Sequence, residues 1–205
     1  MTKKITKKPL LMVVSILLLI VVAMSALSIS ENTVRYNVLA TDRLELASTY
    51  DDLEVVSDVI IKATVASEKE NKTIMSDDGT VIFGYTVTQL NISEVFKGDA
   101  VAGETITITE EYYTLPNEEN VIYTQGNYMP AKEDSEYIFF LKAYDASSPY
   151  AGMYFPVDLE YGKYSVNLAE EMIAPASASA AELEVISSDT RYIEFATKVI
   201  ENYLQ

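Results

Sequence analysis

A long alternating stretch, VIFGYTVTQLNISEVF from Val81 to Phe96, constrains the fold more than any other part of this sequence. Alternation with a period of two is typical of a half-buried β-strand, and this strand is unusually long. Its apolar positions do not keep one phase, however. Tyr85 and Val87 point to one face, whereas Leu90 and Ile92 point to the other. The strand is therefore expected to change the face that it buries.

A bend in the strand explains such a change. A β-bulge adds one residue at a bend, so we expect a bulge at Thr88-Gln89; the alternative is two shorter strands with a kink between them. Five expected strands of uneven length, with a helical segment before and after them, indicate a small closed barrel, in which a long strand bends to serve both halves of the sheet. The sequence therefore predicts a mainly β fold, a five-stranded barrel of the OB type with flanking helices.

Shorter patterns complete this barrel domain, which we place at residues 48–167. Ser48 or Thr49 is expected to cap a short helix that carries Asp51 and Asp52 in its first turn. The elements expected next are a strand in VIIKATVAS (59–67), a hairpin turn in MSDDGT (75–80), an alternating strand in ETITITEEYY (104–113), a loop over 114–134, a buried strand over 136–144 and a final hairpin over 153–167, with Gly162 at its turn.

The carboxyl end of the chain predicts a helix. An Ala/Ser-rich linker over 168–187 leads to residues 188–205, where Ser188 or Asp189 is the expected cap. The apolar residues that fall near one stripe of this helix are Tyr192, Phe195, Val199 and Leu204. Such a stripe usually packs on its own domain, and a partner surface is the alternative.

Five segments carry a resemblance to a known group of domains. They are VSDVIIKATVAS, YTVTQLNISEVFKGD, GETITI, GNYMPAKEDSEYIFFLK and EYGKYSV, within residues 50–167. Their pattern resembles the β-barrel of the netrin-like and tissue-inhibitor-of-metalloprotease group, and that of bacterial extracellular proteins. The resemblance implies an OB-type barrel. It does not extend to the inhibitory mechanism, because the animal inhibitors use an amino-terminal cysteine and this chain has none; no site residue of the group maps here.

The amino-terminal residues predict a membrane anchor. Residues 1–9 are a basic, cytoplasmic tail, and Leu10 to Ile29 is an uncharged apolar run of about 20 residues, the length that spans a bilayer. Residues 30–47 follow as a spacer or a first helix. The alternative is a signal peptide cleaved near Ala23-Met24-Ser25, although signal peptides usually have apolar regions of only about 7–15 residues.

Both interpretations place residues 31–205 outside the cytoplasmic membrane. The chain is then either a single-pass membrane protein with its amino terminus inside the cell, or a secreted protein.

The charge and the missing residue types exclude several functions. Residues 31–205 carry 31 acidic and 11 basic side chains, a net charge of about −20. A field of that sign repels phosphate backbones, so we expect no nucleic-acid partner. The whole chain lacks cysteine, histidine and tryptophan. Disulfides, thiolate or imidazole metal sites and histidine-dependent nucleophiles are therefore ruled out, and no metal or cofactor is expected.

Paired carboxylates remain as the one route to catalysis, as in glycosidases. The acidic pairs are Glu110-Glu111, Glu118-Glu119 and Glu170-Glu171. Neighbours on a strand face opposite ways, so these pairs do not converge on a substrate, and we interpret them as solvated surface. A non-catalytic protein is expected.

Tyrosines are the most informative candidates for binding. The chain has 15 of them, and Tyr112, Tyr113, Tyr123 and Tyr128 lie in or beside the long loop over 114–134. Exposed tyrosine rings supply stacking area at a low cost in conformational entropy, which suits saccharides and proteins. We predict these four as the binding face, because binding residues favour loops on rigid scaffolds. The alternative for each is simple packing in the barrel.

The sequence thus predicts a membrane-anchored binding module that recognises an extracellular protein or an envelope polymer. Modulation or inhibition of an extracellular enzyme is a second hypothesis, based on fold analogy alone. A carboxylate-dependent hydrolase is the third.

Overall fold

The computed structural model describes residues 34–40, 45–118, 120–168 and 189–204, without the side chains of Ser67 and Glu68. The predicted membrane segment, Leu10 to Ile29, and nearly all of the linker lie outside the described residues. Within the described part of the chain, no helix is long and apolar enough to cross a membrane. The elements are β1 Arg35–Leu39, α2 Tyr50–Val56, β2 Val59–Met75, β3 Val81–Lys97, β4 Thr105–Glu110, β5 Tyr112–Thr114, β6 Val121–Gln125, β7 Glu136–Ala143, β8 Tyr154–Pro156, the 3-10 helix η1 Leu159–Gly162, β9 Lys163–Ser165 and α5 Thr190–Tyr203.

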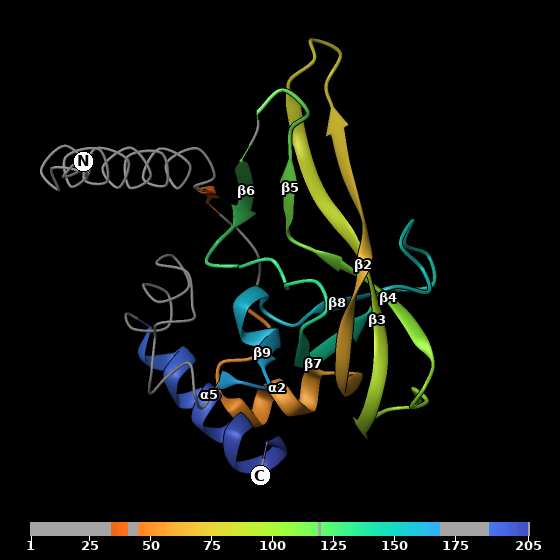
Figure 1. Ribbon diagram of the computed structural model, residues 1–205, viewed down its shortest axis with the longest axis vertical. Coiled ribbons are helices and arrows are strands. Elements are labelled where there is room, and N and C mark those ends of the chain that lie inside the picture. The colour runs from red at the N-terminus through yellow and green to blue at the C-terminus, as the bar shows by residue number, and fades with distance from the viewer. Residues whose placement is uncertain (1–33, 41–44, 119, 169–188, 205) are drawn as a thin grey trace, which may run out of the picture.

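Five strands close into a barrel, as the sequence predicts. Their order is β2-β3-β4-β8-β7, and β7 pairs back to β2 (Figure 1). All neighbours are antiparallel except β4 and β8, which are parallel. The arrangement is compatible with an OB-type fold. Apolar side chains from several strands, including Ile61, Leu90, Ile108 and Phe139, fill the barrel with an exposed fraction of zero.

The change of face predicted at Thr88-Gln89 is wrong; β3 shifts phase later, at Ser93, where its pairing with β2 skips one residue, so that Val95 packs on the same core as Ile92. The buried residues of β3, from Gly84 to Ile92, are all even-numbered, and β3 pairs with β4 through Thr86 to Asn91 without a break. The prediction failed because Thr86 and Thr88 are polar but buried. Each hydroxyl has a buried acceptor, which removes most of the cost of burying it.

The bulge that relieves the bend lies on the facing strand. Val65 pairs with Leu90, and Lys69 pairs with Thr88, so residues 66–68 of β2 lie opposite Gln89 alone. The extra residues were therefore expected at the right level of the hairpin but on the wrong strand.

Beyond this bulge, β2 and β3 continue past the barrel as a two-stranded arm (Figure 1). The arm comprises Lys69–Met75 of β2, Val81–Thr88 of β3 and the turn Ser76–Thr80 that joins them, and at its base Thr86–Thr88 still pair with β4. The predicted MSDDGT turn is confirmed, with Gly79 at φ +84°.

A small second sheet lies beside the arm, in the order β1-β6-β5. It corrects two predictions. The spacer or helix over 30–47 contains a strand, β1, which pairs in parallel with β6; β6 itself lies in the expected loop over 114–134. The alternating segment ETITITEEYY also breaks at Glu111, so that β4 belongs to the barrel and β5 to the small sheet. The strands β1, β5 and β6 are short and show no clear alternation of apolar and polar residues, so hydrophobic periodicity did not identify them.

The prediction of a final hairpin over 153–167 is also wrong. β8 and β9 do not pair with each other, because β2 takes one edge of β7 and both short strands take the other. They follow one another along that edge and are joined by η1.

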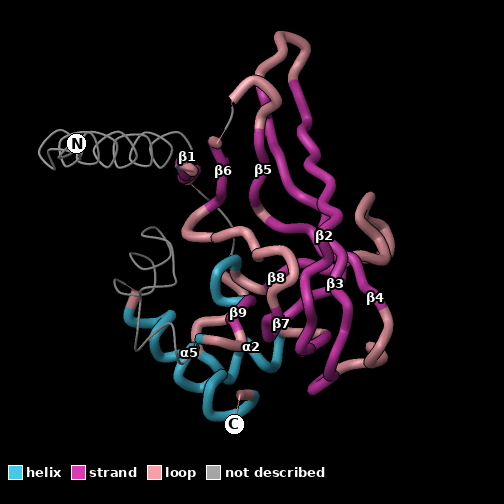
Figure 2. Tube along the Cα trace, viewed as in Figure 1, coloured by secondary structure: helices cyan, strands magenta, loops and turns pink. Residues whose placement is uncertain are grey.

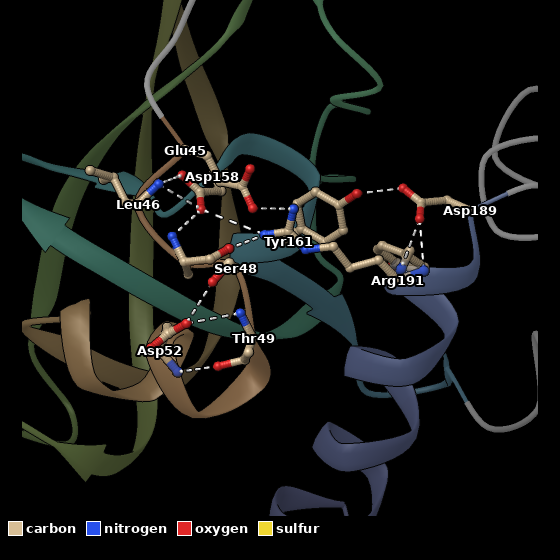
Figure 3. Close-up of polar contacts among 11 residues, drawn as sticks. Glu45, Leu46, Ser48, Thr49, Asp52, Asp158, Tyr161, Asp189 and Arg191 are labelled. Carbon is tan, nitrogen blue, oxygen red and sulfur yellow. Dashed lines mark hydrogen bonds and ion pairs between the residues drawn. The ribbon is translucent and has the colours of Figure 1, made fainter.

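The terminal helix packs on its own domain. Tyr192, Phe195 and Val199 of α5 join α2 and the outer side of the barrel in a second apolar cluster, which includes Phe140 and Tyr164. Asp189 caps the helix, as expected. The short helix α2 is capped by Thr49, one of the two predicted caps, and Thr49 and Asp52 exchange hydrogen bonds in a capping box (Figure 3).

Arg191 joins three parts of the chain at the start of α5 (Figure 3). Its guanidinium forms an ion pair with Glu45 at 2.7 Å, donates to the Ala47 carbonyl and lies 4.3 Å from the centre of the Tyr161 ring. The Tyr161 hydroxyl in turn donates to Asp189 at 2.5 Å. These contacts fix the helix against η1 and the chain before α2.

Candidate functional site

The four predicted tyrosines lie at different depths. Tyr128 has no exposed surface, and Tyr112 and Tyr113 are 8% and 7% exposed. Tyr123 is half-buried. Tyr112, Tyr113 and Tyr128 are therefore buried, and of the four rings only that of Tyr123 is partly open to solvent. A binding role for the four tyrosines stays a prediction.

Tyr113 and Tyr123 form a stacked pair on the small sheet, with ring centres 5.0 Å apart and planes 11° apart. Gly84 makes room for it, because a Cβ atom at that position would lie 2.3 Å from the Tyr113 ring. The Tyr123 hydroxyl donates to Glu118 at 2.6 Å, and this bond raises the pKa of Tyr123. The pair is therefore held in place by the arm on one side and by a carboxylate on the other.

A shallow pocket of about 280 Å³ adjoins Tyr123. Its lining combines two phenol rings, an amide, an apolar side chain and both signs of charge: Arg35, Tyr36, Asn37, Glu118, Val121 and Tyr123. The volume is at the small end for ligand sites and suits one side chain or one sugar ring.

Glu110 is not solvated surface, contrary to the prediction. It is completely buried, and its neighbour Glu111 is only 3% exposed. Four groups donate to the Glu110 carboxylate: the Thr88 hydroxyl at 2.5 Å, the Tyr128 hydroxyl at 2.8 Å, the Ala131 N–H at 2.8 Å and the Lys69 ammonium at 3.3 Å. A carboxylate with this many donors is satisfied and has a structural role.

The network fastens the segment between β6 and β7, Tyr128–Lys132, across the barrel; we call it the strap (Figure 2). Lys69 donates to the Ala131 carbonyl and Lys163 to the Met129 carbonyl. The Lys163 ammonium also lies 4.5 Å from the centre of the Tyr128 ring. Tyr128 is thus an anchor for the strap.

The described residues do not assemble a metal site, because no group of three or more acidic side chains among them could hold an ion. The pairs Glu118-Glu119 and Glu170-Glu171 include residues outside the described ranges. A network that ties the Glu110 carboxylate to four donors within the fold leaves it no room for general acid–base work.

A strip of half-buried aromatic rings runs along the outside of the barrel. It follows the order Phe83, Tyr85, Tyr150, Tyr144 and Phe155, with successive ring centres 5.8, 5.3, 5.0 and 4.8 Å apart. We call this the aromatic strip. The Tyr144 hydroxyl is hydrogen-bonded to Thr109 at 2.7 Å, and burial raises the pKa of Tyr150.

The position of the aromatic strip is informative. In OB-type barrels, ligands contact the second and third strands and the loops after the first and fourth. Those strands are β3 and β4 here, and the loop after the fourth strand is residues 144–153, which supplies Tyr144 and Tyr150. The strip therefore occupies the face on which such barrels present ligands.

The sequence analysis predicted binding residues only in and beside the loop over 114–134, and it missed the aromatic strip. The signal was present, since Phe83, Tyr85 and Val87 share the odd phase of β3. Only the fold brings the loop over 144–153 against them. No protein-family model matches this chain, and no curated protein matches it.

Proposed function

We propose that this protein is a non-catalytic binding module, held outside the cytoplasmic membrane by the apolar segment Leu10 to Ile29, that recognises an envelope polymer or an extracellular protein. The observation that carries the proposal is the aromatic strip. Half-buried rings spaced about 5 Å apart offer stacking area to consecutive units of a chain-like ligand. The pocket at Tyr123 is a second place of contact for one unit.

The charge narrows the class of polymer. Faces of this kind accept oligonucleotides or oligosaccharides, but about 20 net negative charges on residues 31–205 oppose a polyanion. A neutral or cationic glycan is therefore the polymer that suits this face best.

The netrin-like grouping belongs to the same proposal. It rests on the five sequence segments and on a barrel compatible with the OB type. The second candidate function, modulation of an extracellular enzyme, follows from that grouping alone.

The full chain, purified in detergent, should be incubated with glycan and protein fractions of the cell envelope. We expect salt-resistant binding to the protease-treated glycan that is lost in Tyr150→Ala and Tyr85→Ala and kept in Tyr150→Phe, which retains the ring. Binding that depends on Tyr123 alone would move the site to the pocket. Binding that is lost in salt, or equal in all variants, would refute the proposal.

Deletion of residues 114–130 would not be a clean test of a binding face in this loop. The deletion would remove Tyr128, whose hydroxyl is bound to the buried Glu110, and would damage the barrel itself. Point substitutions on the outer face avoid this.

A further inference from the structure

The arm has an edge without a strand partner. β2 pairs with β3 from Ile60 to Met75, apart from the bulge at residues 66–68, but with β7 only through Val59 to Thr64. Val65 then exchanges hydrogen bonds with Asp134 and Ser135. Among the described residues, no strand pairs with the outer edge of Lys69–Met75. At about 3.3 Å per residue this edge is roughly 23 Å long.

The backbone groups on this edge can be assigned by alternation. The Ser76 N–H donates to the Thr80 carbonyl at 2.9 Å, toward the β3 side of the hairpin. Because successive residues of a strand direct their N–H and C=O groups to opposite edges, Thr73 and Met75 direct theirs away from β3. An incoming strand would find an ordered row of donors and acceptors.

Apolar side chains are concentrated at the same place. Ile74 is 48% exposed, Met75 is 52% exposed and Ile82 is 68% exposed, three of the seven large apolar residues that the structure leaves exposed. Charged side chains often protect edge strands from aggregation, and Glu70 and Lys72 fit that role. The exposed Ile74 and Met75 do not, because protection would favour polar residues there.

The charges at the two ends of the edge identify the occupant. The turn carries Asp77 and Asp78, and the other end meets Glu133, Asp134 and Glu136, against Lys132 and Lys69, of which Lys69 is already paired with the buried Glu110. A second copy, paired antiparallel about Asn71, would bring the acidic turn of each copy against the acidic base of the other. The same charges attract a strand with basic residues at its ends.

We propose that Lys69–Met75 of β2 is a docking edge for an extended, cationic polypeptide segment of a partner, which adds to the arm as an antiparallel third strand. This rests on the proposed function and deepens it by naming a protein ligand. It uses the outer edge of β2, whereas Phe83 and Tyr85 of the aromatic strip lie on β3, opposite Ile74 and Lys72. Tyr150→Ala lies outside the arm, so it tests the strip without changing this edge, and the two ideas fail separately.

The test uses the full chain in detergent and two synthetic peptides of alternating Thr and Val, long enough to span Lys69–Met75, with two lysines or two glutamates at each end. Binding is followed by fluorescence anisotropy and by amide hydrogen exchange. We expect the lysine peptide to bind at least about tenfold more tightly than the glutamate peptide and to protect amides of Lys69–Met75.

Two variants make the result specific. Thr73→Pro removes an outward N–H and should weaken binding about tenfold, whereas Thr73→Val keeps the N–H and should bind like the wild type. The double variant Asp77→Lys, Glu133→Lys should weaken the binding of the lysine peptide. It keeps the test independent of Thr73→Pro, in case that variant does not fold. No binding, or binding indifferent to these changes, would overturn the proposal. A dimer that Thr73→Pro dissociates would instead assign the edge to a second copy.

Discussion

The Tyr128 hydroxyl donates a 2.8 Å hydrogen bond to Glu110, and neither side chain has any exposed surface. This bond links the strap to β4 in the interior of the barrel. A carboxylate buried so completely is stable only while its donors remain. The strap is therefore part of the barrel and not a mobile cover over it, which separates the rigid interior from the outer surfaces that we propose for binding.

Two buried tyrosines should respond in opposite ways to the loss of a hydroxyl. Tyr128→Phe removes a donor from Glu110 and should lower the free energy of unfolding by about 1–3 kcal/mol. Tyr164→Phe should leave it unchanged or raise it, because the Tyr164 hydroxyl is buried and has no hydrogen-bond partner among the described residues. Urea unfolding of the full chain, followed by circular dichroism, compares the two; a similar loss in both would contradict the assignment.

Glu110→Gln should be among the most damaging polar substitutions. It leaves the Lys69 ammonium, whose side chain is only 13% exposed, without its carboxylate, and breaking a buried pair typically costs about 3–5 kcal/mol.

The control for Glu110→Gln is Glu94→Gln. Glu94 pairs with Lys62 at 2.7 Å, but its own side chain is 51% exposed, so we expect a loss of under about 1 kcal/mol. Equal losses in the free energy of unfolding of the two variants, measured in urea titrations, would show that the Glu110 network adds nothing to stability.

The fold should lose stability at alkaline pH. Burial raises the pKa of Tyr128 and of Tyr164 well above the ordinary value of 10.0. Since the unfolded chain releases these protons first, stability is complete below pH 10 and falls as the pH rises toward the folded-state values. Tyrosinate absorbance and circular dichroism should therefore change together above pH 10. A gradual rise in absorbance with the fold intact would be the contrary result.

Gly84→Ala should destabilise the arm and disturb the Tyr113–Tyr123 pair, because the new Cβ atom would lie 2.3 Å from the Tyr113 ring. Overpacking of this kind typically costs about 1–3 kcal/mol. In a Tyr113→Ala background the same change should be nearly neutral, since alanine is otherwise preferred to glycine in a strand. A double-mutant cycle of Gly84→Ala and Tyr113→Ala, measured by thermal unfolding, tests this prediction. Additive effects would mean that the Tyr113 ring does not cause the loss of stability.

Phe195→Ala should show that α5 belongs to the domain. Phe195 is 1% exposed and packs 6.1 Å from Tyr50, ring centre to ring centre, so its truncation should cost about 3–5 kcal/mol. Val55→Ala, at a side chain that is 76% exposed, should change stability by less than about 0.5 kcal/mol. If Phe195→Ala were equally mild, the helix would not contribute to the core.

Local patterns in the sequence predict much of this fold. The turn at Asp78-Gly79, the capping box at Thr49 and the buried run of β7 each depend on neighbours along the chain, and the structure has all of them. The barrel was predicted from five strands of uneven length between two helical segments, whereas the change of face that it was meant to explain does not occur at Thr88-Gln89.

The rest depends on contacts between distant residues. Thr86 and Thr88 look solvent-facing until Tyr112 and Glu110 are brought to them, and Glu110 looks solvated until Lys69 and the strap surround it. The aromatic strip likewise depends on contacts between distant residues, because its rings come from β3, β8 and the loop between β7 and β8. Periodicity describes one strand at a time and carries no information about which loop will cover it.

The strap also has a consequence for how the chain acquires its structure. Its contacts join Lys69 to Ala131 over 62 residues and Met129 to Lys163 over 34, so none forms before most of the domain is available. Contacts of such long sequence separation slow folding, because the chain loses the entropy of loop closure before the contacts stabilise it. We expect a single, slow and all-or-none folding transition, and a chain that stays pliable until Lys163 is in place.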